Sequence, residues 1–108
     1  MPAKGRREMI EAMLADSPND PELRYMLAME YVSAGDDAGA VRCFQELIAV
    51  TPTYPPAYHQ GGRAVQRLDR VADARALLVQ GIPIAQKQGD MHAAGEMTEL
   101  LQMLSEPE

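Results

Sequence analysis

The feature that most constrains this chain is a layout that recurs after about 34 residues. One copy runs from Pro18 to Pro52, and a second stretch with the same order of small, apolar and turn residues follows it. Each copy contains two helical patterns separated by a turn. A period of this length is typical of helix pairs that bury their apolar faces only against neighbouring pairs. The sequence therefore predicts an all-α fold built by stacking.

Local signals in the first copy mark where its helices begin and end. Asp20 is a good N-cap, and Pro21 at the next position loses no helical hydrogen bond. Gly35 suits the left-handed position that ends a helix, and Asp36 suits the start of the next one. Pro52 disfavours helical geometry in the residue before it, so the second helix should end there.

Residues that match at this offset are small in some places and bulky in others. Small residues are expected where two helices approach closely, and bulky apolar residues where they fill the remaining space. The matched pairs are Ala28 with Gly62, Tyr31 with Val65, Ala40 with Ala74, Phe44 with Leu78 and Ile48 with Ile82.

This arrangement resembles the tetratricopeptide repeat, in particular the small stand-alone proteins of that family. In the first copy the resemblance rests on Leu27, Ala28, Tyr31, Gly35, Asp36, Ala40, Phe44 and Pro52, and in the second on Tyr58, Gly62, Val65, Ala74, Leu78 and Ile82. The second copy departs at Gly61, where the family prefers leucine, and at Asp69, where it prefers glycine. The fold does not explain Gly61, which either makes room for a partner or is tolerated.

The resemblance implies an α-α superhelix, a right-handed solenoid of two helix pairs flanked by capping helices. We expect a single domain over 1–108. Its parts are an N-terminal half-repeat helix over 8–17, a first repeat over 18–52, a second repeat over 53–88 and a C-terminal capping helix over 90–104. Pro83 lies inside the last helix of the second repeat, where we expect the helix to continue with a kink.

Charge and composition exclude several classes of function. The chain has 108 residues and a net charge of −6, which makes general nucleic-acid binding a poor fit. No apolar run is long enough to cross a membrane, and the basic N-terminus is not followed by the apolar core of a signal peptide, so we expect a cytoplasmic protein. Cys43 is the one cysteine, and we interpret it as a small packing residue. The methionines, among them Met9, Met13, Met97 and Met103, are also interpreted mainly as core.

The residues that carry catalysis are too sparse to predict an enzyme. His59 and His92 lie in different repeats, without metal-ligand spacing around them. Glu96 and Glu99 follow His92 at helical spacing, but we interpret these three as solvated polar residues of a capping helix. We therefore predict no catalytic residue, no metal and no cofactor.

Binding is the function that the pattern favours, because the resemblance implies that the first helix of each pair lines a concave groove. The predicted groove residues are Tyr25, Met29, Val32, Ser33, His59, Arg63, Gln66 and Arg67. Tyr25 and Met29 would form an apolar floor, or would pack between helices instead. The row at His59, Arg63 and Arg67 would hold a carboxylate, or would be a solvated face paired with Asp69, Asp73 or Glu30.

These observations predict a protein–protein interaction module, an adaptor or scaffold, that binds a protein or peptide ligand, with an acidic or C-terminal segment as the best fit. Some family members bind chaperone tails through a Lys/Asn carboxylate clamp, and that pattern is absent here. The alternative is a structural self-association unit, a homodimer formed through the terminal helices or through faces of opposite charge.

Overall fold

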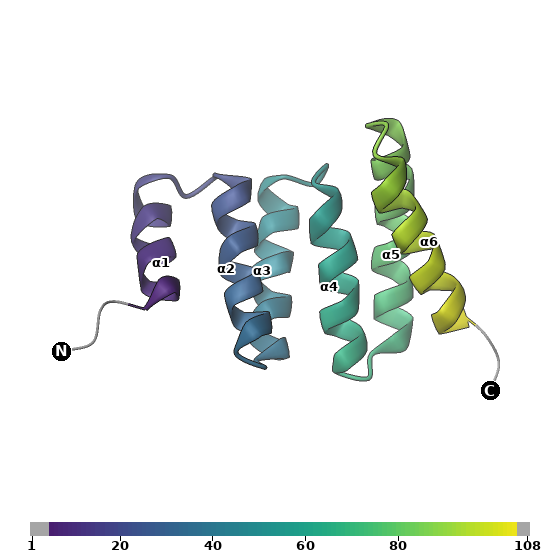
Figure 1. The fold of residues 1–108 in the computed structure, drawn as a ribbon, viewed down its shortest axis with the longest axis horizontal. Coiled ribbons are helices and arrows are strands. Elements are labelled where there is room, and N and C mark those ends of the chain that lie inside the picture. Colours follow the sequence, from purple (N-terminus) through teal and green to yellow (C-terminus); the bar gives the residue numbers. More distant parts are fainter. Residues whose placement is uncertain (1–4, 106–108) are drawn as a thin grey trace.

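The computed structural model describes residues 5–105, and helices make up most of this range. In chain order they are α1 (Arg6–Asp16), α2 (Pro21–Ser33), α3 (Asp37–Val50), α4 (Pro55–Arg67), α5 (Val71–Lys87) and α6 (Met91–Ser105), as Figure 1 shows. No strand occurs in these residues, so the predicted all-α fold is confirmed. The helices begin and end close to the positions expected from the sequence.

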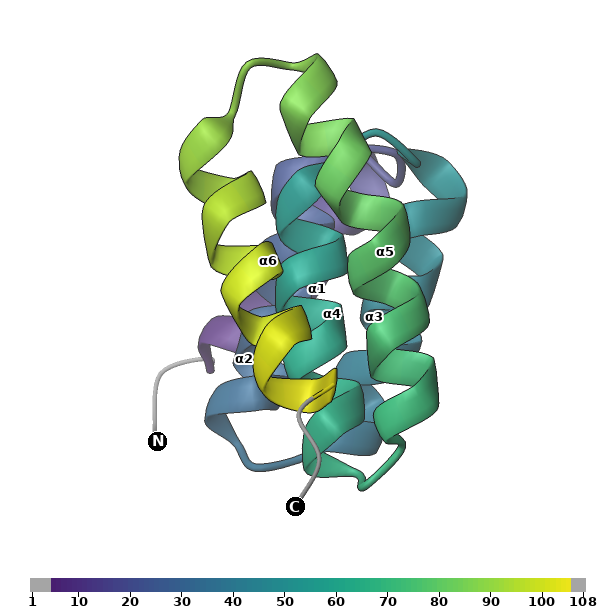
Figure 2. The same cartoon turned by 90° about the vertical axis from the view of Figure 1, so that its right-hand side faces the viewer.

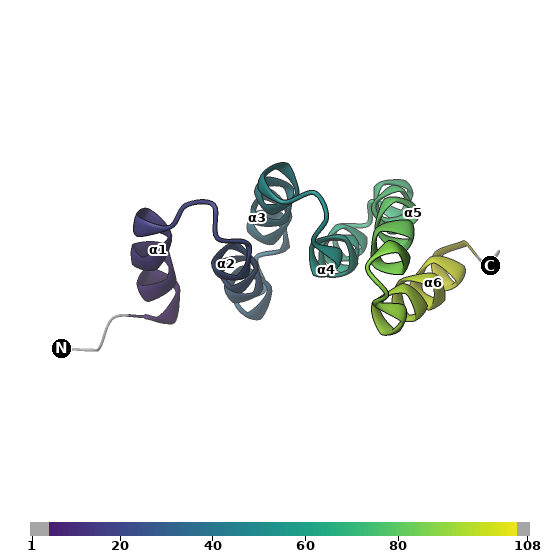
Figure 3. The same cartoon turned by 90° about the horizontal axis from the view of Figure 1, so that it is seen from above.

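The helices form a stack in which each one packs against the next in sequence. Figure 3 shows α3 and α5 on one side of this stack and α2, α4 and α6 on the other. The backbone of α4 contacts both α2 and α6, whereas α3 and α5 do not contact each other. The side that carries α2, α4 and α6 is therefore the tighter one, and we call it the inner side.

The predicted caps of the first repeat are formed. The Asp20 carboxylate accepts hydrogen bonds from the backbone N–H groups of Glu22 at 2.9 Å and Leu23 at 3.3 Å. Gly35 has a φ of 75°, a left-handed conformation that a residue with a side chain adopts only at a cost. The Asp36 carboxylate then accepts from the N–H of Gly39 at 2.9 Å, which starts α3.

The turns of the second repeat use other residues in the same roles. Asp69 adopts a φ of 61° between α4 and α5, a conformation that aspartate tolerates better than most side chains. Before α6, Gly89 has a φ of 76°, and the Asp90 carboxylate accepts from the N–H of Ala93 at 3.1 Å. The departure of Asp69 from the glycine of the family therefore leaves the turn intact.

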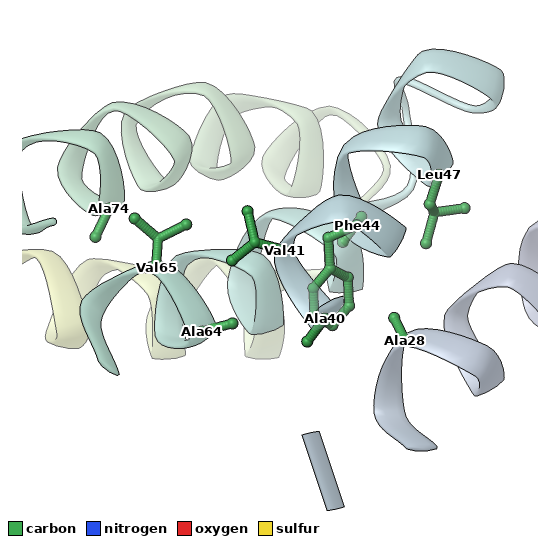
Figure 4. Packing of buried hydrophobic residues seen from close by; sticks show 9 residues of the cluster. Ala28, Ala40, Val41, Phe44, Leu47, Ala64, Val65 and Ala74 are labelled. Carbon is green, nitrogen blue, oxygen red and sulfur yellow. The ribbon is translucent and has the colours of Figure 1, made fainter. Parts of the chain in front are cut away.

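Small and bulky residues alternate in the core as the repeat predicts. Ala28, Ala40 and Ala74 are fully buried; Figure 4 shows Phe44 near Ala28 and Ala40, and Ala74 beside Val65. A second cluster, around Leu78, joins α4, α5 and α6. A Cβ atom added at Gly62 would lie 3.2 Å from Cδ2 of Leu78, so a larger residue there would need the Leu78 side chain to shift slightly.

The structure also bears on the expectations for Pro83 and for the methionines. Helix α5 continues through Pro83, as predicted, while the kink stays a prediction. The interpretation of the methionines as core holds for Met97, which is fully buried, but is wrong for Met9, Met13 and Met103, which are half or more exposed. The reason is that α1 and α6 are the first and last helices among residues 5–105, so each has a face that no other described helix covers.

Candidate functional site

A hollow with two adjoining parts lies on the inner side of the stack, between α4 and α6. One part, of about 290 Å³, reaches Tyr25 on α2, and the other, of about 350 Å³, reaches Gln66 and Met103. His59, Arg63 and Glu96 line both parts, so we describe them together as the inner hollow. In Figure 2, α6 runs in front of α4 along this side.

Tyr25 forms one end of the inner hollow and also packs between helices. Its ring centre lies 6.2 Å from that of Phe44 and 5.9 Å from that of Tyr54, both in tilted geometry. This burial raises the pKa of Tyr25 above its usual value. The two roles considered for Tyr25, floor of the groove and inter-helix packing, are therefore compatible.

Arg63 is the cation that the inner hollow leaves available. It is exposed, and no carboxylate among residues 5–105 lies within ion-pair distance of it. His59 precedes it by one helical turn and is half-buried. Burial lowers the pKa of His59, and Glu96 opposes this shift only in part, so the imidazole is neutral near pH 7 and can either donate or accept a hydrogen bond.

Arg67 lies outside the inner hollow, although it follows His59 and Arg63 at helical spacing on α4. Its Nε lies 2.7 Å from Oδ1 of Asp37, which joins the end of α4 to the start of α3. The alternative in which these arginines pair with carboxylates therefore applies to Arg67, but its partner is Asp37 instead of Asp69, Asp73 or Glu30. Glu30 is paired with Arg6 at 3.2 Å.

The remaining predicted groove residues on α2 lie outside the inner hollow. Met29 and Val32 are half-buried and pack against the core, and Ser33 is exposed at the end of the helix. The structure thus brings together Tyr25, His59, Arg63 and Gln66 from the predicted set, and leaves Met29, Val32, Ser33 and Arg67 apart from them.

Comparison with known proteins identifies the family to which this architecture belongs. No family model matches the chain. A curated TPR repeat-containing protein of Pseudomonas aeruginosa is 34% identical over 97 residues, which cover 90% of this chain and 92% of that protein. The chain belongs to the tetratricopeptide repeat family.

Solved structures of tetratricopeptide repeat domains and of related proteins superpose on this repeat protein. A crystal structure of such a domain from Salinibacter ruber has 32% identity and a TM-score of 0.75, covering 79% of this chain and 94% of that one. A solution structure of a protein from Bordetella parapertussis has 27% identity and a TM-score of 0.82, covering 95% of this chain and 90% of that one.

A more distant neighbour shares the fold alone. The type III secretion translocator chaperone of Yersinia enterocolitica superposes with a TM-score of 0.84 at 11% identity, covering 91% of this chain and 68% of that one.

The α6 residues of the hollow were not predicted from the sequence, and the repeat register identifies only some of them. Sequence reasoning treated α6 only as a cap, yet the same 34-residue offset places Ala93 at the position of His59 and Leu100 at that of Gln66. Ala93 and Leu100 do line the hollow, whereas Met97, at the position of Arg63, is fully buried. Glu96 and Glu99 fall at the positions of Gly62 and Val65, which are buried in α4, so the period does not predict these two glutamates in the hollow.

Residues of α6 and of the turn before it give the inner hollow a mixed charge, instead of the basic character expected from α4 alone. Glu96 and Glu99 face the cations of α4, and Asp90 lies at the Tyr25 end. Glu96 is also 3.1 Å from Nε2 of His92, one turn earlier on α6. The hollow can therefore supply both hydrogen-bond donors and acceptors to a ligand.

The described residues 5–105 contain neither a metal-ligand cluster nor an activated thiol. No cluster of three or more His, Cys, Asp or Glu residues is placed to hold a metal ion there. Burial raises the pKa of the Cys43 thiol, and Glu46 adds to the shift, which disfavours the nucleophilic thiolate. Within residues 5–105 no helix is long and apolar enough to cross a bilayer.

Proposed function

We propose that this tetratricopeptide repeat protein is a protein-interaction module, an adaptor or scaffold, that holds a peptide segment of a partner in the inner hollow. The cytoplasmic location expected from the sequence is part of this proposal. The observation that carries it is the position of Arg63 in a hollow that has Tyr25 at one end. Arg63 has no carboxylate partner among the described residues.

The arrangement of charge favours a ligand with one carboxylate over a strongly acidic one. Arg63 can bind a carboxylate through two parallel hydrogen bonds, because the guanidinium and carboxylate geometries match. Glu96 and Glu99 lie across the hollow and would repel further negative charge. A C-terminal carboxylate, with its preceding side chain against Tyr25, satisfies both conditions.

The experiment compares peptides that differ only at the C-terminus. Short peptides selected for binding from a random library are synthesised with a free or an amidated terminus, and affinity is measured by fluorescence anisotropy. We expect Arg63→Ala to weaken binding of the free acid by roughly 10- to 100-fold, the equivalent of a charge-assisted hydrogen bond worth about 1.5–3 kcal/mol. The amidated peptide should bind weakly to both proteins.

Arg42→Ala is the matched control, because Arg42 is an exposed arginine of α3 and takes part in no ion pair among residues 5–105. It should bind the peptides as the unmodified protein does. Both variants should keep the melting temperature nearly unchanged, since each removes an exposed side chain. Equal losses in the two variants, or none at Arg63, would contradict the proposal.

Self-association is a second candidate, favoured by apolar side chains at the two ends of the stack. Met9 and Met13 on α1 are 55% and 50% exposed, and Met91 and Met103 on α6 are 61% and 66% exposed. Light scattering after size-exclusion chromatography over a range of concentrations separates the candidates. A dimer that dissociates on replacing Met9 and Met13 with glutamine would support self-association, and a monomer at all concentrations would exclude it.

A further inference from the structure

A second cavity lies on the opposite side of α4 from the inner hollow. It has a volume of about 330 Å³ and opens between α3 and α5, whose backbones are not in contact. Its floor is formed by Gly61 and Val65 of α4, and its walls include Phe44 of α3 and Leu77 of α5. Figure 3 shows α3 and α5 side by side on the outer side of the stack, with α4 below the space between them.

Gly61 keeps this cavity open. A Cβ atom added there would lie 3.4 Å from Cβ of Phe44 and 3.7 Å from Cδ1 of Leu77, which are ordinary van der Waals distances. Close packing of helices therefore does not require glycine at this position, and it restricts an added Cβ atom less than at Gly62. A glycine inside a helix also weakens it relative to alanine.

The first repeat shows what the second one lacks. The residue one repeat before Gly61 is Leu27, which is half-buried in α2. The second repeat therefore omits one leucine side chain that the first repeat contains, and it does so at the floor of a cavity. A ligand group that fills the cavity above Gly61 should therefore be apolar and about as large as a leucine side chain.

The rim of the cavity indicates the charge of the occupant. Arg70 and Asp73 lie at the mouth, and neither side chain takes part in an ion pair or hydrogen bond among residues 5–105. Asp73 is in the first turn of α5, where the helix dipole stabilises its charge. Arg70 has no such compensation, so it is the rim group that a carboxylate would pair with.

We propose that this cavity is a docking site for a segment of a partner protein that inserts a leucine- or methionine-sized side chain beside an acidic residue. The aliphatic side chain replaces the one that Gly61 omits, and the carboxylate pairs with Arg70. The site is separate from the inner hollow, because His59 and Arg63 project from α4 on the face opposite to Gly61 and Val65.

The test uses four short, acetylated and amidated peptides with leucine or alanine at the centre and glutamate or lysine beside it. Binding to the isotope-labelled protein is followed by the amide chemical shifts in NMR spectra. We expect the leucine–glutamate peptide to shift the signals of Gly61, Phe44 and Leu77, and each replacement in the peptide to weaken its affinity by about tenfold or more.

Gly61→Leu should abolish these shifts by filling the cavity from within. Ala76→Glu, at an exposed position on the rim, should do the same by blocking the mouth and repelling the carboxylate, and it keeps the test valid if Gly61→Leu does not fold. Gly95→Ala is the control, since Gly95 lies in α6 with nothing within 4 Å of an added Cβ atom, and it should bind normally.

Two results would overturn the proposal. One is the absence of shifts around Gly61 with all four peptides at millimolar concentration. The other is shifts that persist in Gly61→Leu and Ala76→Glu, or that map to His59 and Arg63 instead. Binding at the inner hollow is tested separately through Arg63→Ala, so either proposal can fail without the other.

Discussion

At Gly81, α5 packs closely against the helices on both sides of it. A Cβ atom added there would lie 2.5 Å from Cβ of Tyr58 on α4 and 2.8 Å from Sδ of Met97 on α6. The methionine can move its flexible side chain, but the Cβ atom of Tyr58 is fixed to its backbone. Alanine at position 81 therefore requires α4 and α5 to separate.

The size of the effect follows from two opposing terms. Alanine favours a helix interior over glycine by about 1 kcal/mol. Overpacking of a core costs about 1–3 kcal/mol, and contact with a Cβ atom places this case near the upper end. We expect Gly81→Ala to lower the free energy of unfolding by about 1–2 kcal/mol, which lowers the melting temperature of a domain of this size by roughly 5–15 °C.

Thermal and urea unfolding, followed by far-ultraviolet circular dichroism, measure this loss. Gly95→Ala is the matched control, because Gly95 is also inside a helix but has open space around it. It should raise stability by up to about 1 kcal/mol through helix propensity alone. A Gly81→Ala variant that is as stable as Gly95→Ala would refute the close approach of α4 and α5.

Three further predictions concern the core, a helix cap and pH. Ala40→Leu should lower the free energy of urea unfolding by about 1–3 kcal/mol, because Ala40 is fully buried, and an unchanged curve would contradict the register of α3. Asp20→Ala should lower it by about 1 kcal/mol through loss of the α2 cap, while Asp20→Asn retains most of it. Because burial lowers the pKa of His59, the folded state binds fewer protons than the unfolded state, and stability should fall from about pH 8 to about pH 5. His59→Gln should flatten this decline. Parallel profiles of stability against pH for the two proteins would contradict the assignment of the decline to His59.

The fold was predictable because its signals are local. Caps and turns such as Asp20 and Gly35 act within a few residues, and the repeat then fixes how the helices pack. The register also identified Ala28, Ala40 and Phe44 as core, and all three are buried. Asp69 could replace the expected glycine because a turn requires only the backbone conformation, which aspartate also adopts.

The candidate site was predictable only in part, because it depends on which side chains meet across the stack. Arg67 pairs with Asp37, a residue in the preceding repeat, and helical spacing along α4 does not reveal this. The exposure of Met9 and Met103 depends on where the stack ends, which hydrophobicity does not report. Glu96 lines the hollow although its counterpart one repeat earlier, Gly62, is buried in α4, so the period does not predict it.

The pattern of packing between neighbours has a consequence for how the protein is made. Each helix contacts only helices next to it, or next but one, in the chain, so no contact waits for a distant segment to be synthesised. Chains with such local contacts fold rapidly, and they can fold from the N-terminal end during translation. The pair α2–α3 can therefore assemble while α6 is still in the ribosome. The apolar face of this pair is then exposed only until α4 emerges and covers it.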